Sequence, residues 1–210
     1  MENAGRNLAH LARTRFLDGD PRRRSVLVLA GGGGNGGGAL VAARRLSNWG
    51  ANVTVVLGQP PGKMTAVPGH QLDILGRMNV PIVDEGMLPA APPPAVVLDG
   101  LIGYSLAGPP FGRIAELIRL ANSLDAPILA LDVPSGLDTS TGVAFDPVIR
   151  ATATMTLALP KQGLRVASTS ALIGELYLAD ISVPPGLYQR PPLNIRVGPL
   201  FAHTDIIRLR

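Results

Sequence analysis

Short apolar runs alternate with longer segments of helical spacing along most of this chain. The apolar runs lack a polar residue at every second position, as expected for strands that are covered by helices on both faces of a parallel sheet. They predict strands at Val26–Ala30, Val53–Leu57, Val80–Val83, Val96–Asp99, Ile128–Val133, Ala153–Leu159, Leu176–Ile181 and Leu193–Val197.

Helical spacing is found between these runs. Residues 1–15 place apolar side chains on one side of a helix, and further helices are predicted at residues 37–49, 69–78 and 111–124. Strands that alternate with helices indicate an α/β fold: a Rossmann-like, doubly wound, mostly parallel sheet flanked by helices in a three-layer sandwich. After about residue 150 the predicted strands follow one another directly. No internal repeat or boundary divides the chain, so residues 1–210 are predicted to form a single domain.

The most distinctive segment is Ser25–Leu46, SVLVLAGGGGNGGGALVAARRL. An apolar strand leads through a glycine loop into a helix, which is typical of phosphate- and nucleotide-binding α/β proteins. A flexible linker is the alternative, but the strand and the helix flank the loop directly. Gly31, Gly33 and Gly36 satisfy the G-x-G-x-x-G pattern, yet no Asp or Glu lies between Asn35 and Asp73 to hold a ribose, which argues against a dehydrogenase. No Lys-Ser or Lys-Thr follows the glycines, so a P-loop NTPase is not indicated either.

Composition narrows the chemistry further. The sequence has no cysteine, which excludes disulfides, a catalytic thiolate and cysteine-based zinc sites. The three histidines, His10, His70 and His203, lie far apart and show no metal-ligand spacing. Apolar residues make up 46% of the chain and charged residues 16%, which suits a buried sheet.

The net charge is +4, and several arginines are concentrated near the N-terminal end, namely Arg13, Arg15, Arg22, Arg23, Arg24, Arg44 and Arg45. They could attract a phosphorylated ligand, but no aromatic residues interleave with them, so nucleic-acid binding is not indicated. No apolar run approaches the roughly 20 residues of a membrane span, and the first residues make a poor signal peptide. We therefore expect no membrane association and a cytoplasmic location.

Three loops are expected to meet at one edge of the sheet, because ligands of such folds bind beyond the carboxyl ends of the strands. They are the glycine loop, residues 99–109 and residues 132–136. Their convergence predicts a nucleotide-type ligand site.

Five segments carry a resemblance to a known family, in its order and at about its spacing. The chain resembles the NAD(P)H-hydrate epimerases, the YjeF N-terminal-domain proteins, over nearly its whole length. The segments are MENAG at residues 1–5, GGNGGGALVAAR at 33–44, LDGLIG at 98–103, LDVPSG at 131–136 and TLALPK at 156–161.

The resemblance implies an isomerase of metabolite repair that interconverts the R and S epimers of hydrated NADH or NADPH and holds a potassium ion. It implies that a separate S-specific dehydratase acts downstream on the product, and it suggests a homodimer. Carried over residue by residue, the potassium ligands would include Asn35, Asp99 and Ser135. The implied substrate-binding residues are Gly34, Asn35, Gly36, Gly37, Gly38, Gly103, Tyr104, Ser105, Leu106, Ala107, Gly108, Pro109 and Asp132.

Asp132 is our candidate catalytic acid/base, because it closes an apolar strand at the predicted site. Protonation of the hydroxyl on the ring carbon beside the nitrogen would let it leave as water, and its return to the other face would give the epimer. The alternative is a structural carboxylate that caps the turn before Pro134.

The glycine loop departs from the family pattern, which usually reads Asn-Asn-Gly-Gly-Asp-Gly. Here the first Asn is Gly34 and the Asp is Gly38, so backbone N–H groups would hold the ligand there. A non-catalytic nucleotide-binding or scaffold module with the same fold is therefore the alternative function. The family's MENAG segment normally follows an upstream helical stretch, so whether the natural start lies upstream of Met1 is left open by the sequence.

Overall fold

A computed structural model describes residues 1–84, 86 and 93–210 of the protein. Within these residues, eight strands form one sheet in the order β3-β2-β1-β4-β5-β6-β7-β8, with every neighbouring pair parallel except β7 and β8. The strands are β1 (Ser25–Ala30), β2 (Asn52–Leu57), β3 (Ile82–Val83), β4 (Val96–Gly100), β5 (Ile128–Leu131), β6 (Ala153–Leu157), β7 (Glu175–Ala179) and β8 (Ile206–Arg208).

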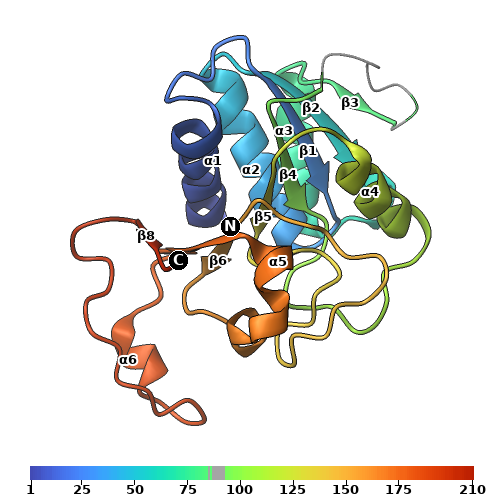
Figure 1. Ribbon diagram of the computed structural model, residues 1–210. Coiled ribbons are helices and arrows are strands. Elements are labelled where there is room, and N and C mark those ends of the chain that lie inside the picture. Colours follow the sequence, from blue (N-terminus) through green and yellow to red (C-terminus); the bar gives the residue numbers. More distant parts are fainter. Residues whose placement is uncertain (85, 87–92) are drawn as a thin grey trace.

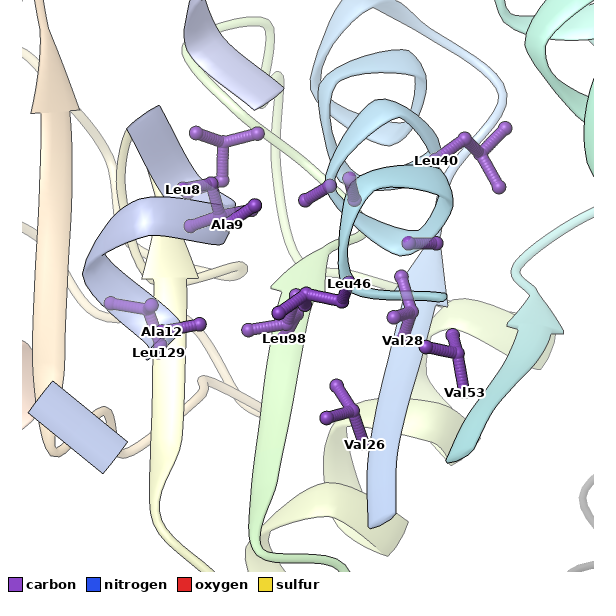
Figure 2. Close-up of a cluster of buried hydrophobic side chains, with 14 of the residues drawn as sticks. Leu8, Ala9, Ala12, Val26, Val28, Leu40, Leu46, Val53, Leu98 and Leu129 are labelled. Atoms are coloured by element: carbon purple, nitrogen blue, oxygen red, sulfur yellow. The ribbon is translucent and has the colours of Figure 1, made fainter. Parts of the chain in front are cut away.

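Helices cover both faces of this sheet, as the sequence predicts (Figure 1). Side chains of α1, α2 and α3 pack on one face, and side chains of α4 pack on the other. Figure 2 shows Leu8 and Ala12 of α1 and Leu46 of α2 above Leu98 and Leu129 of the sheet. The helices are α1 (Glu2–Phe16), α2 (Gly34–Asn48), α3 (Ala66–Arg77), α4 (Gly112–Ser123), α5 (Ser170–Ile173) and α6 (Pro185–Tyr188), with short 3-10 turns at Pro61–Lys63, Gln162–Arg165 and Ala167–Thr169.

Small residues let α1 and α2 approach closely. A Cβ atom on Gly5 would lie 2.4 Å from the carbonyl oxygen of Gly38, so no other residue fits there without movement of the backbone. The far side of α1 contacts the end of the chain: Asn7 Nδ2 donates to the carbonyl of Asp180 at 2.8 Å, and Arg15 pairs with Glu175. The first helix is therefore held between α2 and the segment around β7.

Seven of the eight predicted strands are confirmed, but several end earlier than the apolar runs suggest. β5 ends at Leu131 and β6 at Leu157, because Asp132 and Ala158 adopt left-handed backbone conformations with φ of 68° and 65°. Ser182 does the same, with φ of 64°, beyond the end of β7. β3 is restricted to two residues; the preceding Pro81 has no N–H to donate.

The strand predicted at Leu193–Val197 is wrong. Asn194 has a φ of 50°, which interrupts an extended run, and the N–H groups of Leu193 and Asn194 both donate to the carbonyl of Arg190 in a turn. The last strand is instead β8, which pairs antiparallel with β7 through Ile206, Ile207 and Arg208. An antiparallel edge strand on a parallel sheet is common in such folds.

The direction of strand order reverses between β1 and β4. The chain moves outward through β2 and β3 on one side and then returns to place β4 against the other side of β1. Ligands of doubly wound folds bind beyond the carboxyl ends of the strands at such a switch point. Among the described residues, no helix is long and apolar enough to cross a membrane.

Candidate functional site

A cavity of about 570 Å³ lies at the carboxyl ends of the strands, within the size range of ligand pockets. Its walls come from the glycine loop after β1 and from the loops that follow β4, β5, β6 and β7. The lining residues are Ala4, Gly32, Gly33, Gly34, Asn35, Gln59, Leu101, Ile102, Gly103, Tyr104, Ser105, Ile114, Leu131, Asp132, Leu157, Ala158, Lys161 and Ile181.

Helix α2 begins in the wall of this cavity. Gly33 is the N-cap and no side chain caps it, and a Cβ on Gly33 or Gly34 would meet nothing within 4 Å. The first N–H groups of α2 therefore remain accessible to an anionic group, which the helix dipole also favours.

The next three glycines of the loop serve a different purpose. A Cβ on Gly36 would lie 1.7 Å from the carbonyl oxygen of Gly31, one on Gly37 would meet the Met1 side chain, and one on Gly38 would lie 2.8 Å from Leu131. All three are buried inside α2 and do not line the cavity. Their structural role is close packing, and their predicted contact with a ligand stays a prediction.

Asn35 links the glycine loop to the loops after β4 and β5. Its Nδ2 donates to the carbonyl of Leu131 at 3.1 Å, and its amide oxygen lies against Gly103, where an added Cβ would be 3.2 Å from it. The side-chain oxygen is thus directed toward the loop after β4.

Asp99 is completely buried at the end of β4, behind the cavity wall. Its Oδ1 accepts hydrogen bonds from Leu101 N (3.1 Å) and Ser135 Oγ (2.6 Å), and its Oδ2 accepts one from Ser135 N (2.8 Å). Burial raises the pKa of Asp99 to about 6, although the hydrogen bonds from Ser135 and Leu101 act in the opposite direction. No ion pair to this carboxylate occurs among the described residues.

Ser135 joins the loops after β4 and β5. Its hydroxyl donates to Asp99 and accepts a hydrogen bond from Ile102 N at 2.8 Å. Asp99 and Ser135 therefore fix the shape of the loop that carries Gly103 and Tyr104 into the cavity.

Asp132 lies at the end of β5, in the cavity wall, and only 4% of its surface is exposed. Its Oδ1 accepts hydrogen bonds from Lys161 Nζ and from Leu157 N (3.2 Å). Lys161 and Asp132 form an ion pair, and Lys161 also lines the cavity. A carboxylate with a fixed cation beside it, in the wall of a pocket, is a typical arrangement for proton transfer.

A second cavity of about 530 Å³ adjoins the first. Both are lined by Gln59, Ile102, Ser105 and Ile114. Its wall is formed mainly by residues 105–113, which lead from the loop after β4 into α4, and Lys63 also lines it. Two adjoining cavities suit an extended ligand better than a compact one.

The structure divides the predicted site residues into three groups. The first cavity is lined by Gly34, Asn35, Gly103, Tyr104, Ser105 and Asp132, and the second by Ser105, Leu106, Ala107, Gly108 and Pro109. Asp99 and Ser135 lie behind the first cavity, and Gly36, Gly37 and Gly38 are buried in α2. Sequence reasoning missed Lys161 and Gln59 as lining residues. The signal for Lys161 was its place in the TLALPK segment, which brings it back to the end of β6.

The fold and the site define a Rossmann-like α/β protein with its ligand site at the switch point of the sheet. A family model described as "YjeF-related protein N-terminus" matches residues 1–163. The chain belongs to this family, and the resemblance read from the sequence is confirmed.

Similar proteins point in the same direction. A protein of Dehalogenimonas lykanthroporepellens named NAD(P)H-hydrate epimerase is 47% identical over 203 residues, 96% of this chain and 80% of that protein. One of Cenarchaeum symbiosum with the same name is 38% identical over 187 residues, 88% of this chain and 85% of that protein. The bifunctional NAD(P)H-hydrate repair enzyme Nnr of Moorella thermoacetica is 35% identical over 208 residues, and the match spans 94% of this chain but 38% of that protein.

A solved structure supports the fold. The crystal structure of the yeast protein ynu0 (YNL200c) superposes with a TM-score of 0.79 at 23% identity, covering 99% of this chain and 88% of the yeast chain. At this level of identity the comparison establishes the architecture only.

Proposed function

We propose that the protein is an NAD(P)H-hydrate epimerase, which interconverts the R and S epimers of hydrated NADH and NADPH. The observation that carries the proposal is the Asp132 carboxylate in the wall of a cavity that is also lined by the open N-terminus of α2 and by the loop of Gly103 and Tyr104. The relatives that bear this name match the chain over most of its length.

The two adjoining cavities accommodate the two halves of a dinucleotide. We place the hydrated nicotinamide ring in the cavity with Asp132 and the remainder of the molecule toward the loop of Ser105–Pro109. The free N–H groups at the start of α2 would then bind a phosphate oxygen of the ligand. Asp132 exchanges a proton with the hydroxyl on the ring carbon beside the nitrogen, which is the atom whose configuration changes.

The donor set behind the cavity is suited to a potassium ion. Asn35 Oδ1, the Asp99 carboxylate and the Ser135 hydroxyl are hard oxygen donors, and Asp99 is buried without an ion-pair partner among the described residues. These three residues would hold the ion, which would supply positive charge beside the loop after β4 and orient it. A higher melting temperature in potassium than in sodium or tetramethylammonium chloride would support this assignment. Equal melting temperatures in the three salts would contradict it.

The reaction product would pass to a separate dehydratase. Bifunctional repair enzymes such as that of Moorella thermoacetica are longer than this chain, which spans about 38% of that protein. A partner enzyme that acts on the S epimer would complete the repair. The homodimer, which the family resemblance suggests, and the cytoplasmic location, which the sequence suggests, remain predictions.

A coupled assay tests the function. The R epimer of hydrated NADH is incubated with excess S-specific dehydratase and potassium, and recovery of the near-ultraviolet absorbance of NADH is followed with and without the protein. We expect faster recovery with the protein. If folded protein gives no acceleration over spontaneous epimerisation, the site is a non-catalytic nucleotide-binding module or acts on another substrate.

A further inference from the structure

Lys161 lines the cavity beside Asp132, but the proposed function gives it no role of its own. Its Nζ contacts Asp132 Oδ1, lies 2.9 Å from the carbonyl oxygen of Leu157 and 3.2 Å from Thr156 Oγ1. Its side chain is 22% exposed, and the side chain of Asp132 is 5% exposed. The ammonium group is therefore largely enclosed and fixed by three oxygen atoms.

These three partners account for all the protons of the ammonium group. A lysine carries three N–H donors, and Asp132, Thr156 and Leu157 provide one acceptor for each. No proton of Lys161 is left for a ligand in this arrangement. Lys161 consequently acts on a ligand through Asp132 rather than directly.

The backbone conformation near Asp132 and Lys161 is also unusual. Asp132 and Ala158 are both non-glycine residues in the left-handed region, and both line the cavity. Such conformations cost energy and are found mainly where the surrounding structure requires them. At this turn, Asp132 Oδ1 accepts hydrogen bonds from Lys161 Nζ and Leu157 N. No described residue donates a hydrogen bond to Oδ2, so this oxygen is available to a ligand.

We infer that Lys161 is a positioning residue that holds Asp132 as a carboxylate, so that Asp132 Oδ2 acts first as a base and opens the hydrated ring. This inference rests on the proposed epimerase function. Oδ2 takes the proton of the ring hydroxyl, the O–H electron pair forms a C=O bond, and the adjacent C–N bond breaks. Its electron pair stays on nitrogen, which takes a proton from a water molecule, and that water molecule in turn receives the proton held by Oδ2. Rotation of the new aldehyde and the reverse steps on its other face give the epimer.

This route differs from loss and return of the hydroxyl as water. Loss of water needs Asp132 to start as a protonated acid, whereas the ion pair with Lys161 supplies a carboxylate. The two routes also differ in the fate of the hydroxyl oxygen. Ring opening keeps that oxygen on its carbon atom, and loss of water exchanges it with the solvent.

The first experiment follows the oxygen in the wild-type protein. The R epimer is converted in heavy-oxygen water with enzyme in excess, and the mass of the S epimer is measured after one turnover, with the exchange seen without protein subtracted. We expect the product to retain its original oxygen. Incorporation of heavy oxygen into each converted molecule would overturn the assignment of Asp132 as the base.

The second experiment tests whether Lys161 acts through Asp132. We expect Lys161→Met to lower kcat about 100-fold, because a reactive carboxylate that is displaced from its position lowers the rate by about that much. KM should stay within about threefold of the wild-type value. Lys161→Arg, which keeps the cation, should recover part of the loss. In an Asp132→Asn background, Lys161→Met should lower the rate by less than about threefold, because both changes remove the same function.

A further loss of about 100-fold in the double variant would show that Lys161 acts independently and would overturn the inference. Arg22→Met serves as the matched control. Arg22 is an exposed cation that pairs with Asp20 and precedes β1, at the amino ends of the strands. This variant should leave the rate unchanged. Thermal melting confirms that each variant is folded. If the wild-type protein itself does not accelerate epimerisation, the proposed function fails, and this outcome is distinguished from failure of the role of Lys161 alone.

Discussion

The two ends of the sheet hold carboxylates in opposite surroundings. At the amino end, Glu175 accepts hydrogen bonds from Arg15 Nη2 (2.8 Å) and Nε (2.9 Å) and from Tyr177 Oη (2.7 Å), and these partners lower its pKa to about 2. At the carboxyl end, Asp99 is fully buried, and within the described part of the chain it accepts hydrogen bonds only from neutral donors. Burial raises its pKa to about 6.

The contrast between Glu175 and Asp99 distinguishes a carboxylate that stabilises the fold from one that belongs to the functional site. The ion pair of Glu175 with Arg15 fixes α1 to β7 and is favourable as it stands. The buried charge of Asp99 is unfavourable without a further partner, which is the situation expected where a ligand or an ion completes a site. Asp132 shares one property with each of these carboxylates, because it has a cation partner, as Glu175 does, and it belongs to the functional site, as Asp99 does.

The largest effect is expected from Asp132→Asn. The amide cannot take the proton of the substrate hydroxyl, so kcat should fall by about 1,000-fold, within the range for loss of a general acid or base. The protein should stay folded but melt at a lower temperature, because the largely enclosed Lys161 ammonium loses its carboxylate partner. The coupled assay and thermal melting measure the two quantities.

Asp73→Asn is the matched control for this variant. Asp73 is an exposed carboxylate on α3 that pairs with Arg77 and lines neither of the two cavities. Its replacement should leave kcat unchanged. An Asp132→Asn protein with wild-type turnover would remove Asp132 from the reaction and leave it as a turn-capping residue.

A smaller effect, on stability, is expected from Asp99→Asn. Both carboxylate oxygens accept hydrogen bonds from N–H or O–H donors, and an amide would place its NH₂ group against one of these donors. We expect the free energy of unfolding at neutral pH to fall by about 2 kcal/mol, as for other buried polar groups that lose a partner. Urea denaturation measures it. An unchanged or higher stability would mean that the buried charge costs more than these hydrogen bonds contribute.

The smallest effect is expected from Glu175→Gln at the amino end. The folded-state pKa of Glu175, about 2, lies below its ordinary value of 4.5, so its stabilising effect is present above pH 4.5 and is lost as the pH falls toward 2. The variant should be less stable than the wild type by no more than about 1 kcal/mol at pH 7, the range for partly exposed ion pairs. The two proteins should become equally stable near pH 2. A difference in stability that does not depend on pH would contradict this account.

Much of the fold could be predicted because buried parallel strands leave continuous apolar runs in the sequence. The errors fall where one residue turns the backbone away from the strand. Val133 is apolar, so the apolar run in the sequence extends past β5, although the left-handed Asp132 has already ended the strand. Asn194 interrupts the run at Leu193–Val197 in the same way, whereas β8 is too short to give a pattern of its own.

The candidate site was less predictable than the fold. Its position follows from the topology, since the carboxyl ends of the strands converge at the switch point. The contact between Lys161 and Asp132 could not be predicted from the sequence. The two residues are 29 positions apart, and they meet because β5 pairs with β6. The glycine loop likewise gives no indication that Gly33 and Gly34 are open while Gly36 and Gly38 are packed.

The attachment of α1 also has a consequence for biosynthesis. The polar contacts of this helix with Glu175, Asp180 and Ser182 join residues separated by 160 to 179 positions. At about 5–20 residues per second, a ribosome needs roughly 10 to 30 s to add the intervening chain. The helix can pack on α2 early in this interval, but its hydrogen bonds to the far segment form only after β7 has left the ribosome. The first helix of the chain is therefore among the last elements to be secured in a newly made molecule.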